Sequence, residues 1–297
     1  MLAIWPLASA LAAALLAAVN VADKHVVTRL TKSITFMLSV DALAGLAFAV
    51  AIILLHGLEP LSAFNAFIGL LAGAFFMVHA WFYFESMKVE EVSRVIPILY
   101  LGTLPIAVFA FVLLGEVLRP VKYLGAALLV AGAIILSVRS LKEMRFGKAT
   151  KPLAISILFS AAYAVTIKYL LDYAGAFTVF SYSRFGAVLA MAVIVAVVGK
   201  RTLAAEAAAA GPRTAKIVAA LAVASMAAFL LITIAAETGP ITAVSAILST
   251  QALFVLVFAV LIRLTYPAAL DEELSRTTLM QKVLGTLLML IGVALVK

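Results

Sequence analysis

Residues 122–132 read KYLGAALLVAG, and residues 282–292 read KVLGTLLMLIG. Both stretches begin Lys-X-Leu-Gly and carry a second glycine seven residues after the first, and their starts are 160 positions apart (282 − 122). Because self-similarity at a fixed offset is the signature of a duplicated unit, these stretches indicate that the chain contains two copies of one larger element.

Charged residues at the ends of apolar segments repeat in the same way. Glu85 ends one segment as Glu237 ends another, and Lys24 corresponds to Lys168, at offsets of 152 (237 − 85) and 144 (168 − 24). The smaller offsets early in the chain predict longer loops in the second copy, of which residues 200–216 are one.

The composition places both copies in a membrane. The 297 residues are 66% hydrophobic and 12% charged, whereas soluble domains are roughly half apolar and about a quarter charged. No cysteine is present, which excludes disulfides and thiolate metal sites. The net charge of +8 arises from basic residues between apolar segments. That pattern is typical of membrane topology, so we predict no nucleic-acid partner.

The apolar segments predict helices. A hydrocarbon core of about 30 Å needs about 20 residues of α-helix. The predicted helices cover residues 2–22, 34–55, 61–84, 92–115, 121–138, 152–171, 177–199, 215–236, 241–263 and 279–296.

These helices divide into two groups of five. We predict a first repeat over residues 1–138, a basic cytoplasmic linker over 139–151 and a second repeat over 152–297. Because five is odd, the copies would have opposite orientations. The predicted fold is therefore an all-α membrane protein with ten transmembrane helices, arranged as two inverted five-helix repeats around a central cavity. This architecture is typical of transporters that bind substrate near the bilayer midplane.

The distribution of basic residues predicts an orientation. Seventeen of the 22 Lys and Arg residues fall on the side opposite the two chain termini. The positive-inside rule then places both termini outside the cytoplasm, in a multi-pass protein of the plasma membrane. A dual-topology ancestry, in which this bias carries no meaning, is the alternative.

Asp41 and Arg184 lie inside predicted helices, where a charged side chain usually faces protein or water and is a functional candidate. Their positions in inverted copies predict similar depths, so they could bind the two ends of one zwitterion. The alternatives are that each neutralises a neighbour, or that Arg184 extends to the membrane interface.

A second polar group surrounds the turn after residue 84. Glu85, Glu90 and Arg94 lie there, with His79 and Tyr83 nearby. Carboxylates in such a place can carry protons that couple transport to a gradient. The simpler interpretations are a surface pair between Glu90 and Arg94 and a core role for His79.

Lys24 and Lys168 suit anionic groups of a substrate, although lysines at helix ends also bind lipid headgroups. Asn20, Tyr163 and Gln251 could line the same cavity or form hydrogen bonds between helices. The three histidines form no ligand pair on one helix face, so we predict neither a metal nor another cofactor.

Prolines and glycines predict features of packing. Pro97 and Pro105 interrupt the segment 92–115 and predict a bend there. Four glycines of the repeated stretches predict close helix packing, either within one chain or in a dimer: Gly125, Gly132, Gly285 and Gly292.

Several of these motifs resemble a known family. The runs EEVSRVIP at 90–97, LLGE at 113–116 and KYLG at 122–125, with Gly132 after them, are similar to the repeat of the drug/metabolite transporter superfamily, EamA-type branch. The resemblance implies a ten-helix permease with a central cavity, in a superfamily that moves amino acids, nucleotide sugars, sugar phosphates and other metabolites. Many relatives have cytoplasmic termini, which differs from the orientation that the charges predict.

We therefore predict a secondary transporter, an exporter or exchanger, that moves a small polar or zwitterionic metabolite by alternating access. A proton is the candidate coupling ion, and the protein would act in the lipid bilayer as a monomer or homodimer. One alternative is a transporter or flippase of a phosphorylated or lipid-linked metabolite. The non-transport alternative is a membrane-embedded enzyme using His79, Glu85 and Glu90, but no triad or phosphate loop supports it, and we predict no enzyme.

Overall fold

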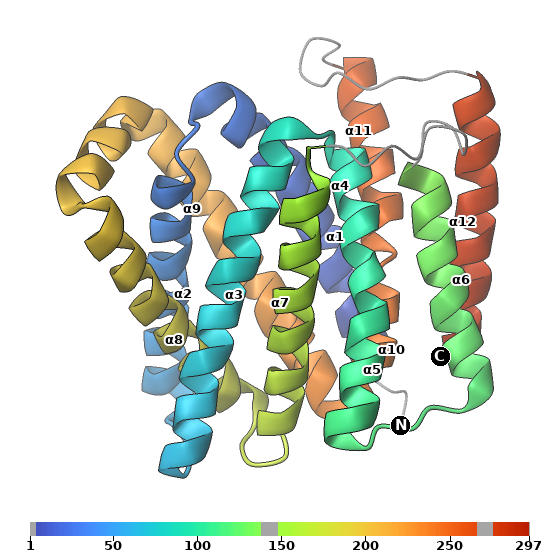
Figure 1. Ribbon diagram of the computed structural model, residues 1–297, viewed down its shortest axis with the longest axis horizontal. Coiled ribbons are helices and arrows are strands. Elements are labelled where there is room, and N and C mark those ends of the chain that lie inside the picture. Colours follow the sequence, from blue (N-terminus) through green and yellow to red (C-terminus); the bar gives the residue numbers. More distant parts are fainter. Residues whose placement is uncertain (1–3, 138–147, 266–275, 297) are drawn as a thin grey trace.

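The computed structural model describes residues 4–137, 148–265 and 276–296, and the regular structure in these ranges is helical. The helices run up and down through one bundle (Figure 1), and α1 begins and α12 ends toward its lower end. The first-half elements are α1 (Ile4–His25), the π-helical turn η1 (Val26–Leu30), α2 (Ile34–His56), α3 (Ala63–Val89), α4 (Val92–Leu99), the 3₁₀ turn η2 (Tyr100–Gly102), α5 (Thr103–Leu114) and α6 (Pro120–Ser137). The second-half elements are α7 (Thr150–Leu170), α8 (Ala176–Val198), α9 (Lys200–Thr238), α10 (Ile241–Leu248), α11 (Gln251–Thr265) and α12 (Arg276–Val296).

Helix length and composition confirm a multi-pass membrane protein. Within the described residues, six helical stretches are long and apolar enough to cross a bilayer, and further apolar helices are shorter. Each predicted segment coincides with helix, since hydrophobic runs of this length form structure whose backbone hydrogen bonds are satisfied internally.

Two predicted helices, 92–115 and 241–263, are broken rather than continuous. The first break lies at η2, which ends three residues before Pro105, whose ring nitrogen cannot donate a backbone hydrogen bond. The second lies at Ser249 and Thr250, whose hydroxyls donate to carbonyls three residues back and compete with the helical pattern. A 3₁₀ turn thus interrupts the segment in which the prolines predict a bend, while the second break was not predicted.

The predicted loop at residues 200–216 is wrong for most of its length. Residues 200–210 are helical, because the alanine-rich run has a high helix propensity. The α9 helix is interrupted at Gly211, which has φ of 74°, immediately before Pro212. The Ser33 hydroxyl donates to the Glu206 carboxylate over 2.5 Å and attaches this extension to the start of α2.

The repeated glycines pack two helices of this chain together. A Cβ on Gly132 would lie 2.6 Å from the Gly285 carbonyl oxygen, and a Cβ on Gly292 would lie 2.7 Å from the Gly125 carbonyl oxygen. These reciprocal contacts make α6 and α12 antiparallel neighbours (Figure 1), as the intramolecular interpretation of the glycines predicted.

Carboxylates cap helix N-termini at the lower end of the bundle. The Glu116 side chain accepts hydrogen bonds from the backbone N–H groups of Ile241 and Thr242 at the start of α10. Glu237 accepts from the Ala176 N–H at the start of α8. Since helix N-termini carry partial positive charge, these acids stabilise the turns at that end.

Candidate functional site

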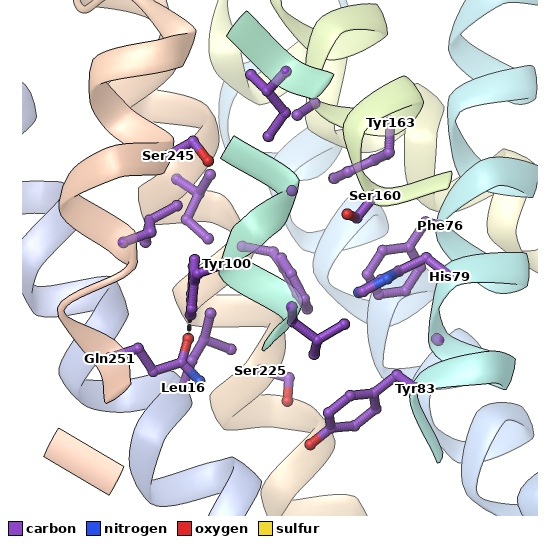
Figure 2. A pocket seen from close by; sticks show the side chains of 18 of the residues that line it. Leu16, Phe76, His79, Tyr83, Tyr100, Ser160, Tyr163, Ser225, Ser245 and Gln251 are labelled. Carbon is purple, nitrogen blue, oxygen red and sulfur yellow. Dashed lines mark hydrogen bonds between the residues drawn. The ribbon is translucent and has the colours of Figure 1, made fainter. Parts of the chain in front are cut away.

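A cavity of about 210 Å³ lies in the centre of the bundle. It is lined from both halves of the chain, by α1, α2, α3 and the α4–η2–α5 segment on one side and α7, α9, α10 and α11 on the other (Figure 2). Drug-sized ligands occupy pockets of about 300–1,000 Å³. The cavity therefore suits a smaller molecule.

The two broken helices meet at this cavity. The Tyr100 hydroxyl, at the first break, donates a hydrogen bond to the side-chain oxygen of Gln251, beside the second break (Figure 2). The Thr103 and Ser245 hydroxyls lie 3.1 Å apart in the same crossing. The breaks thus bring polar groups from the two halves into contact in an otherwise apolar centre.

One part of the cavity wall carries two carboxyl groups. Asp23 of α1 and Asp41 of α2 both line the cavity and lie close enough to interact electrostatically. Asp23 is buried, with 7% of its surface exposed. Tyr83 interacts with Asp23, and its hydroxyl donates to the Asn20 side-chain oxygen over 3.0 Å. Among the described residues, neither carboxyl has a Lys or Arg partner at ion-pair distance.

Arg184 is buried behind the cavity wall, with 1% of its surface exposed. Its Nη2 donates to the Tyr163 hydroxyl over 2.9 Å, and its Cζ lies 4.2 Å from the Phe76 ring centroid. Phe180 and Phe229 are also within 6 Å of this Cζ, at 5.1 and 5.8 Å. Aromatic faces attract a guanidinium, so these rings hold Arg184 in place.

Arg184 crosses α2 one turn after Asp41. A Cβ on Gly45 would lie 2.9 Å from the Arg184 Cδ, so only a glycine leaves room for the arginine there. Arg184 interacts electrostatically with Asp41 without forming a close ion pair. The two charges predicted to share a zwitterion are therefore neighbours, with Asp41 at the cavity and Arg184 enclosed beside it.

His79 lines the cavity and is hydrogen-bonded to α7. Its Nδ1 lies 2.8 Å from the Ser156 hydroxyl and 3.1 Å from the Ser156 carbonyl oxygen. One ring nitrogen therefore has a fixed partner, which orients the ring toward the site.

Lys24 and Lys168 bind helix C-termini and do not line the cavity. The Lys24 ammonium donates to the carbonyl oxygens of Met87 and Glu90 over 2.6 and 2.8 Å. The Lys168 ammonium donates to those of Ala236 and Gly239 over 2.7 and 3.1 Å. Cations stabilise the carbonyls that a helix leaves unpaired at its end.

Glu85 and Glu90 do not line the cavity either. Glu85 pairs with Lys88 over 3.5 Å, and the Glu90 carboxylate accepts from the Glu91 N–H over 3.1 Å. The Arg94 side chain lies outside the described part of the structure. The cavity lining includes six of the predicted site residues: Asn20, Asp41, His79, Tyr83, Tyr163 and Gln251.

Sequence reasoning missed Asp23, Tyr100 and Ser225, which also line the cavity. The first predicted helix ends at residue 22, because Asp23 is the first charged residue after the apolar stretch. The π-helical turn extends that helix to Leu30, so Asp23 lies inside the span. An adjacent acid and base in an apolar stretch was the available signal.

Comparison with known proteins gives a family match for the first half of the chain and a fold match for nearly all of it. Residues 3–138 match the EamA-like transporter family. A Sinorhizobium protein named as an uncharacterized transporter in the cobO 3′ region is 36% identical over 75 residues, which are 25% of this chain. The match spans half of that relative. A crystal structure of a protein that is 17% identical aligns with a TM-score of 0.68, over 99% of this chain and 95% of the other, and shows the same fold.

Proposed function

We propose, from the match of residues 3–138 to the EamA-like transporter family, that the whole chain is a secondary transporter of a small polar or zwitterionic metabolite. The family points to a membrane transporter rather than an enzyme. The observation that carries the proposal is the central cavity, which both halves line and where two broken helices meet.

The proposed architecture is two inverted five-helix repeats, at 1–138 and 152–297, joined by a linker at 139–151 that lies largely outside the described residues. Three correspondences support it. The breaks begin at Tyr100 and Ser249, 149 positions apart (249 − 100). The carbonyls that bind the two lysines, Met87 with Ala236 and Glu90 with Gly239, have the same offset. The reciprocal α6–α12 contacts complete the relation.

Alternating access follows from this architecture. When two inverted copies rock against one another, a cavity between them opens to each side in turn. Broken helices suit such movement, because the turns at the breaks can change angle without disrupting a continuous helix. Asp41, Glu85 and Glu90 remain the proposed proton carriers, and of these only Asp41 lines the cavity.

Uptake into proteoliposomes tests the proposal. Purified protein would be reconstituted, and uptake of labelled amino acids, amines, sugars and sugar phosphates measured with and without a pH gradient. Asp41→Asn and Arg184→Gln should lower uptake, whereas exposed Lys200→Met should not. If no solute enters faster than into protein-free liposomes, the proposed function is wrong.

We also propose that both termini face outward from the plasma membrane. The chain lacks cysteine, so single cysteines can report topology. On intact cells, a membrane-impermeant maleimide should label Leu58→Cys, between α2 and α3. It should label Arg201→Cys, near the start of α9, only after permeabilisation. The reverse pattern would place the termini in the cytoplasm.

A second pocket supports a second candidate, transport of a lipid-linked or phosphorylated metabolite. A pocket of about 720 Å³ lies between α1, η1, α9 and α11. Its lining is largely apolar, with His25 and Arg213 as the groups that could contact a phosphate. Flipping of a labelled phospholipid in proteoliposomes would support this candidate if Arg213→Gln abolished it, and its absence in the wild type would reject it.

A further inference from the structure

We infer that the substrate of the central cavity is a small organic cation, such as an amine or a quaternary ammonium compound. The inference rests on the proposed transport function and narrows its substrate class. It begins from the charges that surround the cavity. Within the described residues, the lining contains Asp23 and Asp41 but neither Lys nor Arg.

Of the two carboxyl groups in the lining, Asp41 has a cationic neighbour and Asp23 has none among the described residues. Arg184 lies beside Asp41 and interacts with it, so these two charges offset each other. Asp23 interacts with Asp41 and Tyr83, and in the described part of the chain no Lys or Arg nitrogen lies within 4.0 Å of it. A buried carboxylate without a counter-ion is costly, and a bound cation would supply that counter-ion.

Lys24 is next to Asp23 in the sequence, but its ammonium group binds carbonyl oxygens of another helix. Its ammonium donates to two carbonyl oxygens at the end of α3. The lysine therefore stabilises a helix terminus, while the aspartate beside it faces the cavity.

Aromatic side chains in the same cavity as Asp23 suit a cation. Tyr83 interacts with Asp23, and both Tyr83 and Tyr100 line the cavity. Figure 2 shows Tyr83 and Tyr100 on the same part of the cavity as Ser225. A carboxylate with neighbouring aromatic faces is the arrangement that recognises alkylammonium groups.

The position of Arg184 disfavours an anionic or zwitterionic ligand in this conformation. A carboxylate of such a ligand would need a cation in the lining, but the guanidinium is 1% exposed and hydrogen-bonded to Tyr163. Phe76 and Phe229, whose ring centroids lie 4.2 and 5.8 Å from its Cζ, line the cavity, whereas Arg184 does not.

Three probes of similar shape separate the charge classes. Choline is a cation, 3,3-dimethyl-1-butanol is its neutral counterpart, and glycine betaine carries the same ammonium with a carboxylate. Binding to the purified full-length protein in detergent would be measured by calorimetry. Choline should bind at least about tenfold more tightly than either of the others, because a charge-assisted contact contributes that much or more.

Two aspartate variants test whether the cation binds at Asp23. Asp23→Asn, which keeps the shape, should weaken choline binding by about tenfold or more. Asp172→Asn removes an exposed carboxyl in the turn between α7 and α8 and should leave binding unchanged. Size-exclusion profiles establish that each variant is folded, and the three-probe comparison on the wild type needs no variant.

The inference is wrong if the neutral or zwitterionic probe binds as tightly as choline, or if none of the three binds. Uptake of other solutes in the same proteoliposomes separates this failure from that of the proposed function. Transport of neutral or anionic solutes without choline binding would reject only the cation assignment. Absence of all transport would reject the transporter.

Discussion

The tightest helix crossing makes a direct prediction about stability. In the structure, α3 and α8 cross at Gly73 and Gly186: a Cβ on Gly186 would lie 2.0 Å from the Leu70 carbonyl oxygen, and one on Gly73 would lie 2.1 Å from the Ser183 carbonyl oxygen. Ordinary contact begins at 3.4 Å, so Gly186→Ala requires the helices to separate by about 1.4 Å (3.4 − 2.0). Backbone atoms cannot rotate aside as a flexible side chain can.

The expected cost follows from this geometry. Overpacking a core costs about 1–3 kcal/mol, and we expect about 3 kcal/mol for Gly186→Ala because the clash is with backbone. At about 2–4 °C per kcal/mol, the unfolding temperature should fall by about 6–12 °C. The measurement is thermal unfolding of the detergent-solubilised protein, followed by far-UV circular dichroism.

Gly102→Ala is the matched control. Gly102 has ordinary helical angles, φ −56° and ψ −21°, and the nearest atom to an added Cβ is 3.6 Å away. The substitution should be neutral or stabilise by about 0.4–1 kcal/mol, since alanine restricts the unfolded chain. Unfolding of Gly186→Ala within about 2 °C of the wild type, or equal destabilisation of the two variants, would contradict a backbone clash at this crossing.

Two further predictions concern helix ends and use the same unfolding measurement. Lys24→Met and Lys168→Met should each lower the free energy of unfolding by about 1.5–3 kcal/mol, because each loses charge-assisted hydrogen bonds to a helix C-terminus. Exposed Lys200→Met should have no effect, and a cost at only one of the two capping lysines would contradict their equivalence. Glu116→Ala should cost about 0.5–2 kcal/mol by uncapping α10. An unchanged unfolding temperature would show that the cap contributes nothing.

Hydropathy predicted where the helices lie but not where they break. The segments 92–115 and 241–263 are both largely apolar, with Arg94 and Arg263 near their ends, and hydropathy treats each as one helix. The first break had a local signal in its prolines. The second depends on Ser249 and Thr250, whose hydroxyls could equally have bonded to a neighbouring helix.

The roles of the charged residues were harder to predict than their positions. Lys24 and Lys168 were recognised as equivalent, but their carbonyl partners lie 63 to 71 positions away in the sequence. Arg184 was recognised as intramembrane, yet its enclosure by aromatic rings depends on three other helices meeting α8. Whether a charge faces a cavity or a helix end is decided by such distant partners.

The amino-acid sequence by itself determined that the chain lies in a bilayer, which segments are apolar enough to cross it, and that one unit recurs. Burial in lipid requires a segment length and a composition that are visible in the local sequence. Tertiary structure alone decided that two broken helices touch, that Asp23 reaches the central cavity and that Arg184 does not. Each of these facts depends on packing between segments far apart in the chain, and a small shift of one helix would alter them without changing a single residue.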